Sequence, residues 1–165
     1  MGSLTNSTES EHLKVTTDKS YADLLKSDGE VLVNSLGSSM EPFVRNRSDV
    51  LLIRSCPAEQ MERFDVPMFV RTDGHFVVHR ILKIRSDGSF LTAGDHCTYT
   101  ETVPAERVIG VLDSIIRDGK TLPARYRDLS FFGKLGVRMR CGMFHPVHVF
   151  FLKCVRKMKR FLRNR

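Results

Sequence analysis

Three kinds of side chain used in nucleophilic catalysis occur in order along this chain: Ser39, His79, and a carboxylate at Asp95 or Glu101. A serine hydroxyl is a poor nucleophile at neutral pH and needs a neighbouring base to take its proton. Histidine suits that role because its pKa lies near neutrality, and a carboxylate on its other ring nitrogen fixes the tautomer. The residue types therefore indicate a nucleophile, a general base and an orienting acid, and they leave Asp95 and Glu101 as alternatives for the acid.

The local sequence around Ser39 favours a bend that presents its hydroxyl. Two β-type runs, residues 30–33 and 49–54, flank this stretch. Between them, Gly37 can adopt backbone angles that are closed to other residues, and Pro42 fixes φ and removes a hydrogen-bond donor. A serine in such a bend is more often a solvated turn residue than a nucleophile, so the assignment depends on the stretches that contain the histidine and the acids.

The elements that must position these side chains read mainly as strands. Asp-Gly pairs are among the strongest short signals for a β-hairpin, and three of them separate apolar runs: Asp73-Gly74, Asp87-Gly88 and Asp118-Gly119. The runs that they join are residues 66–70, 76–84, 89–92 and 108–116. We expect residues 76–84 to form one strand on which Phe76, Val78, Leu82 and Ile84 share a face. The pattern predicts a coiled antiparallel sheet.

Helical signals lie at the two ends of the chain. Residues 19–27 read as a short helix with Ser20 as its N-cap. Residues 129–139 predict a weaker helix, and the three- and four-residue spacing of apolar side chains over 144–162 predicts an amphipathic one. The expected fold class is α+β, with a disordered polar tail (1–18), a β-rich domain (19–123) and a basic helical tail (124–165).

The charge of the chain is divided unevenly along its length. The formal net charge is +7; residues 1–119 hold 13 basic against 18 acidic side chains, whereas residues 120–165 hold 13 against 1. An anionic membrane surface is therefore one expected partner, through residues 141–165, and packing of the tail on its own domain is the alternative. Nucleic acid is not expected, since the basic residues accompany no recognition motif.

Composition limits the classes of protein to which the chain could belong. An apolar fraction of 41% is typical of a globular protein, and residues 1–20 lack the apolar core of a secretory signal, so we expect a cytoplasmic protein, with peripheral membrane contact as the alternative. The four cysteines show no paired C-x-x-C spacing, which argues against a zinc knuckle or a disulfide framework. His75, His79, His96 and Cys97 have no recognised ligand spacing, and we expect no metal and no cofactor.

Three stretches, Gly37-Ser-Ser-Met-Glu-Pro42, Val78-His-Arg-Ile81 and Leu91-Thr-Ala-Gly-Asp95, resemble the three conserved boxes of the signal peptidase I family of serine proteases. The histidine makes the chain similar to the endoplasmic-reticulum branch, since the bacterial branch uses lysine. The self-cleaving phage and SOS repressors share the family fold. The resemblance covers residues 30–113 and implies a β-rich endopeptidase with Ser39 as nucleophile, His79 as base, and Glu101 or Asp95 as the third member.

The resemblance also implies roles for neighbouring residues and a reaction. Ser38 or a backbone amide would hold the oxyanion, and Gly37 and Arg80 would be supporting residues of the site. Met40 and Pro42 would line the substrate groove, and the reaction would be hydrolysis of a peptide bond in a leader- or signal-like peptide. Gly37 departs from the family, which commonly has a serine there as oxyanion donor; losing one such donor typically costs about 10²–10³ in rate.

Two other classes of function stay open beside the protease. The membrane anchor of signal peptidases does not appear in this sequence, so we expect a short member that trims peptides in the cytoplasm. The first alternative is a catalytically decayed binding or regulatory module on this fold. The second is a membrane-surface interaction protein whose basic tail is its main functional part.

Overall fold

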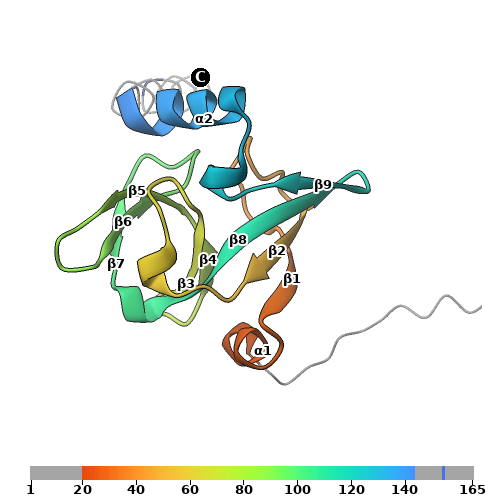
Figure 1. Cartoon of the computed structure of the whole chain (residues 1–165), viewed down its shortest axis with the longest axis vertical. Helices are drawn as coiled ribbons and strands as arrows, with labels where there is room; N and C mark the ends of the chain where they lie inside the picture. The colour runs from red at the N-terminus through yellow and green to blue at the C-terminus, as the bar shows by residue number, and fades with distance from the viewer. Residues whose placement is uncertain (1–19, 144–153, 155–165) are drawn as a thin grey trace, which may run out of the picture.

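Residues 20–143 and residue 154 are described by the computed structural model of the protein, so the predicted tail 1–18 and nearly all of the predicted helix 144–162 lie outside the described residues. Over these residues the fold is mixed α+β, with a β-rich, curled antiparallel sheet and two α-helices (Figure 1). The helices are α1 (Tyr21–Asp28) and α2 (Phe131–Val137). The strands are β1 (Glu30–Asn34), β2 (Val50–Arg54), β3 (Pro67–Val70), β4 (Phe76–Val78), β5 (Arg80–Ile84), β6 (Phe90–Ala93), β7 (Glu101–Val103), β8 (Val108–Arg117) and β9 (Lys120–Pro123).

The strands form two sheets. The larger has the order β1-β2-β8-β3-β4, with β9 also paired to β8, and the smaller has the order β5-β6-β7. Every pairing between these strands is antiparallel. The long strand β8 is the centre of the larger sheet because it pairs with β2, β3 and β9.

The three predicted Asp-Gly hairpins are confirmed. Asp73-Gly74 joins β3 to β4, Asp87-Gly88 joins β5 to β6, and Asp118-Gly119 joins β8 to β9. In the last of these, both turn residues have positive φ, 51° for Asp118 and 72° for Gly119, which is the geometry that favours this dipeptide in tight hairpins.

The prediction of one continuous strand over residues 76–84 is wrong. The run is interrupted at His79: β4 pairs with β3 in the larger sheet, whereas β5 pairs with β6 in the smaller one. A register shift between Ile81 and Lys83 breaks the alternation further, so that Leu82 packs in a different apolar cluster from Phe76 and Val78. His79 therefore lies where the chain passes from one sheet to the other.

The described helices agree with the predicted positions. In α1, the Ser20 hydroxyl accepts a hydrogen bond from the Ala22 amide as N-cap, and Leu25 packs into the main core. Helix α2 lies within the predicted range 129–139 and continues as a π-helical segment, Arg138–Met143. None of the helices in the described part of the chain combines the length and apolar content that crossing a membrane requires.

Candidate active site

The Ser39 loop, residues 35–49, connects β1 to β2 and is held by contacts with the core and with the loop that precedes β7. Met40 is buried in the main core, and its carbonyl oxygen accepts a hydrogen bond from the Val44 amide at 3.0 Å. The carbonyl oxygen of Ser39 accepts one from the His96 amide at 2.8 Å. Because the backbone on both sides of the serine is anchored, the position of its side chain is set by the fold.

The contact with His96 depends on a glycine. A Cβ atom placed on Gly94 would lie 2.5 Å from the carbonyl oxygen of Ser39 and 2.8 Å from the Cys97 sulfur. Any side chain at residue 94 would push these groups away. The Gly-Asp stretch predicted as the third box thus packs directly against the serine of the first.

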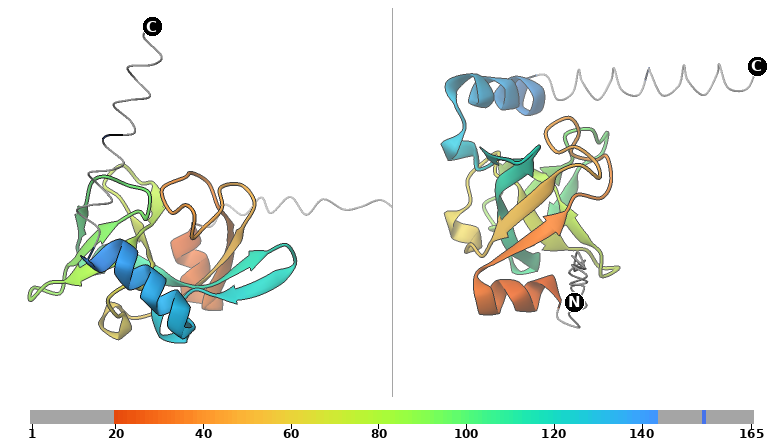
Figure 2. Two further views of the ribbon diagram at one scale, coloured as in Figure 1. Left: turned by 90° about the horizontal axis from the view of Figure 1, so that it is seen from above. Right: turned by 90° about the vertical axis from the view of Figure 1, so that its right-hand side faces the viewer.

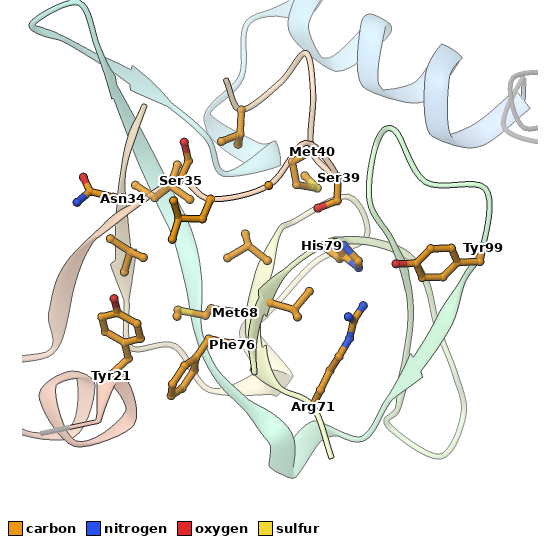
Figure 3. Close-up of a pocket in the computed structure, with 17 residues that line it drawn as sticks. Tyr21, Asn34, Ser35, Ser39, Met40, Met68, Arg71, Phe76, His79 and Tyr99 are labelled. Atoms are coloured by element: carbon orange, nitrogen blue, oxygen red, sulfur yellow. The ribbon is translucent and has the colours of Figure 1, made fainter. Parts of the chain in front are cut away.

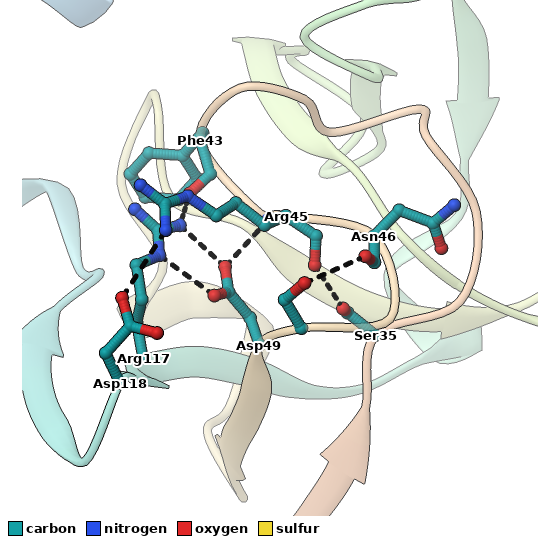
Figure 4. Close-up of polar contacts among 8 residues, drawn as sticks. Ser35, Phe43, Arg45, Asn46, Asp49, Arg117 and Asp118 are labelled. Atoms are coloured by element: carbon teal, nitrogen blue, oxygen red, sulfur yellow. Dashed lines mark hydrogen bonds and ion pairs between the residues drawn. The ribbon is translucent and has the colours of Figure 1, made fainter.

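The far end of the same loop is held by a buried carboxylate (Figure 4). Asp49 accepts two hydrogen bonds from the Arg117 guanidinium, at 2.9 and 2.6 Å, and one from the Arg45 amide at 2.7 Å. Arg117 also donates to the Phe43 carbonyl oxygen at 2.8 Å, and the Ser35 hydroxyl donates to that of Arg45 at 2.6 Å. These bonds tie the loop to β8, and the guanidinium lowers the pKa of Asp49 so that the carboxylate stays charged.

Ser39 and His79 line one cavity of about 280 Å³, and Figure 3 shows the Ser39 side chain directed into it, above the ring of His79 in this view. The structure therefore brings the two predicted residues together. The cavity lies between the edge strands β1 and β4 of the larger sheet, with Met40 and Met68 among its apolar lining and Tyr99 beside it.

His79 is buried, and its Nδ1 atom lies 2.6 Å from Oε1 of Glu101. A carboxylate can only accept here, so Nδ1 carries the proton and Nε2 is the free acceptor of the neutral ring. Burial lowers the pKa of His79 below its ordinary value of 6.5, and the opposing charge of Glu101 offsets this only in part. At neutral pH the imidazole is consequently uncharged and able to take a proton.

Glu101 is held by a second residue, Arg71, which the sequence analysis missed. The Arg71 guanidinium donates two hydrogen bonds to the carboxylate, both at 2.9 Å. Partial burial raises the pKa of Glu101, but the bonds to Arg71 together with the charges of Arg71 and His79 outweigh it, and the net pKa is lowered. Glu101 is therefore an ionised acceptor. The sequence does contain a signal for Arg71: it lies between an apolar run and the Asp73-Gly74 turn. A predicted hairpin therefore places this charge at the end of a strand.

Asp95, the other predicted acid, has a different partner. Its carboxylate accepts two hydrogen bonds from the buried Arg80, both at 2.8 Å. The same guanidinium donates to the Phe64 carbonyl oxygen at 2.9 Å and lies 4.4 Å from the centre of the Phe43 ring. The pair supports the packing beneath the Ser39 loop, and it is Glu101 that contacts His79.

The remaining predicted residues are distributed around the serine. Ser38 is exposed, and the Gly37 amide donates to the Asn46 side chain at 3.0 Å. Pro42 was predicted to line the groove and does not: it lies in a separate surface depression with Phe43 and Arg117, because the turn after Met40 directs it away from the cavity.

The arrangement holds the elements of a serine–histidine–carboxylate triad in chain order Ser39, His79, Glu101. A neutral imidazole with its Nδ1–H bonded to a carboxylate leaves Nε2 to accept the proton of a hydroxyl in the same cavity. Comparison of the chain with family models, curated proteins and solved structures finds no match.

Proposed function

We propose that the protein is a serine endopeptidase resembling the signal peptidase I family, in the endoplasmic-reticulum branch with histidine as base. One observation carries the proposal: Ser39 and His79 line one cavity while Glu101 contacts the Nδ1 atom of His79. The three motif stretches that resemble the family boxes support it, since the first and third pack against each other at Gly94. We infer the family's β-rich fold on the same grounds.

In the proposed reaction, the Ser39 hydroxyl oxygen attacks the carbonyl carbon of the scissile peptide bond while Nε2 of His79 takes its proton. The tetrahedral intermediate collapses, the C–N bond breaks, and the imidazolium returns the proton to the leaving amine. A water molecule, deprotonated in turn by His79, then attacks the acyl carbon; the bond to the Ser39 oxygen breaks, and the imidazolium returns the proton to that oxygen. Glu101 accepts the Nδ1–H bond throughout and stabilises the transient imidazolium. Amides near residues 38–39 would hold the oxyanion.

The walls of the cavity support a peptide as the substrate. It lies between β1 and β4, which are edge strands of the larger sheet. An extended peptide can pair with an exposed strand edge through main-chain hydrogen bonds and place alternate side chains in an apolar cavity. A leader- or signal-like peptide fits this description, with Met40 and Met68 contacting a small or apolar side chain next to the scissile bond.

The test uses the full chain and a fluorophosphonate probe, which reacts covalently with an activated serine. We expect labelling at Ser39, and its loss in Ser39→Ala and His79→Ala. Ser55→Ala is the control because this serine is exposed and lies outside the cavity lining. In cells, a new peptide terminus that appears with the wild type and not with Ser39→Ala would identify the substrate. Labelling that survives in His79→Ala would refute the proposed base.

The second candidate is a binding or regulatory module whose catalysis has decayed. It is favoured by the Gly37 amide, which is engaged by Asn46 where the family commonly has a serine as donor. Under this alternative the cavity still binds a peptide, but Ser39 is unreactive to the probe. Equal peptide affinity of the wild type and Ser39→Ala, without cleavage by either, would favour the module.

A further inference from the structure

Four large apolar side chains on α2 and the π-helical segment that follows it are exposed to solvent. Phe131 and Phe132 are 75% and 80% exposed, and Leu135 and Met139 are 43% and 47% exposed. Their spacing of one, four and eight residues places them on one side of the helix. We call these four residues the α2 face.

The opposite side of the same helix is already used for packing. Val137 and Cys141 contact the apolar cluster that contains Phe64, Leu82 and Tyr126. The inner side of the helix therefore makes the apolar contacts with the domain. The α2 face lies on the other side and is exposed to solvent. The two phenylalanine rings contact each other edge to face, with centroids 5.6 Å apart, and so form one continuous aromatic patch.

The charge next to this patch is positive. The exposed Arg138 follows α2 directly, whereas the Lys134 ammonium lies 6.0 Å from the centre of the Tyr126 ring, on the side of the helix that faces the domain. From Lys120 to Arg165, the sequence has 13 basic residues and 1 acidic residue, and residues 144–165 include basic but no acidic residues. The chain's own C-terminal segment has the same sign of charge as the surroundings of the α2 face, which disfavours it as the occupant. An anionic surface has the opposite sign and is favoured.

Aromatic and aliphatic side chains beside lysine and arginine are the composition of helices that lie in a membrane interface. We propose that the α2 face docks on an anionic lipid surface, with Phe131, Phe132, Leu135 and Met139 entering the headgroup region and Arg138 contacting lipid phosphates. This extends the membrane contact expected for residues 141–165 to a defined face of the described fold. The proposal is independent of whether Ser39 is catalytic.

The position of α2 in the fold allows this contact. Figures 1 and 2 show α2 outside both sheets, at the end of the molecule toward which the loops before β2 and before β7 project. Those loops contain Ser39 and Asp95. A lipid surface that contacts the α2 face would therefore lie at the end of the molecule where these two loops are found.

The experiment measures binding of the full chain to lipid vesicles by co-sedimentation. We expect binding to vesicles of phosphatidylglycerol and phosphatidylcholine, roughly tenfold or more weaker binding to phosphatidylcholine alone, and weakening with salt. The Phe131→Ser/Phe132→Ser variant should lose roughly tenfold or more in affinity for the anionic vesicles. Ile84→Ser/Leu122→Ser is the matched control because it removes two exposed apolar side chains elsewhere, and it should bind as the wild type does.

Several results would overturn the proposal. Equal vesicle binding by the wild type and Phe131→Ser/Phe132→Ser would show that the basic tail alone makes the contact. An equal loss of affinity in the control variant would show that the effect is not specific to the α2 face. Concentration-dependent self-association in the absence of lipid, abolished by the double phenylalanine variant, would make the face a dimer interface. Preferential binding to single-stranded RNA over the vesicles would replace the lipid with a nucleic acid. Because all these variants keep Ser39, His79 and Glu101, probe labelling should be unchanged, so this proposal and the proposed activity can fail separately.

Discussion

Replacement of Gly94 by alanine tests whether the third motif positions the serine of the first. The added methyl group would lie 2.5 Å from the Ser39 carbonyl oxygen, 2.8 Å from the Cys97 sulfur and 3.0 Å from the Ser39 Cβ. An ordinary carbon–oxygen contact is about 3.3–3.6 Å, so the Ser39 backbone must move by roughly 1 Å. Overpacking of this kind typically costs about 1–3 kcal/mol of stability. A displacement of about 1 Å at a reacting group costs on the order of 10²-fold in rate.

Gly110→Ala is the matched control. Its methyl group would lie 2.7 Å from the Arg54 carbonyl oxygen and 2.9 Å from an Ile53 carbon, so the steric conflict is similar in size, but none of its close contacts is with the Ser39 loop. The assay is the rate of fluorophosphonate labelling of Ser39 per folded molecule, with the free energy of unfolding measured in urea. We expect both variants to lose stability and only Gly94→Ala to lose labelling. Labelling of Gly94→Ala at the wild-type rate, or an equal loss in both variants, would refute the reasoning.

Three more predictions concern the charged residues of the site. Glu101→Gln should slow labelling of Ser39 by up to about 10⁴-fold, because the amide no longer selects the Nδ1–H tautomer of His79; an unchanged rate would remove Glu101 from the mechanism. In the wild type, labelling should rise with pH through a pKa below 6.5, since the ring must lose its proton and burial lowers its pKa. In Arg71→Ala this rise of labelling should move to higher pH, because the Arg71 charge helps to lower the pKa of His79. The control Arg54→Ala removes an exposed ion pair with Glu30 and should leave the pH profile unchanged. A wild-type pH profile in Arg71→Ala would contradict the electrostatic role of Arg71. Asp95→Asn should cost about 3–5 kcal/mol in urea unfolding by leaving the Arg80 charge buried without its carboxylate, well above the cost of Glu101→Gln; a wild-type urea midpoint would show that the pair does not stabilise the fold.

Local sequence signals were sufficient for the turns, and they singled out Ser39 and His79 as candidate site residues. The Asp-Gly pairs locate three hairpins because their backbone preference depends on two adjacent residues only. Ser39 and His79 were found through short motifs. That they line one cavity depends on the pairing of β1, β2, β3 and β4, which short motifs do not specify.

Other features depend on tertiary register and could not be predicted from the sequence. Residues 76–84 contain no glycine, proline or other turn signal, so nothing local marks the passage between sheets at His79. The choice between the two acids is made by pairing in the smaller sheet, where Thr92 lies opposite Glu101. Arg71 reaches that carboxylate from the other sheet, across 30 residues of sequence.

The placement of the site across both sheets has a mechanical consequence. The proposed nucleophile, Ser39, belongs to a loop of the larger sheet, and the proposed orienting carboxylate, Glu101, is the first residue of β7 in the smaller sheet. His79 lies between β4 and β5, where the chain passes from one sheet to the other. Arg71, which follows β3 of the larger sheet, donates to Glu101 of the smaller sheet and so links the two sheets. A small displacement of one sheet relative to the other would change the separation of Ser39, His79 and Glu101 without any substitution at these residues. Substitutions in the packing between the sheets, at Val111 or Ile81, are therefore expected to change the reactivity of Ser39 from a distance.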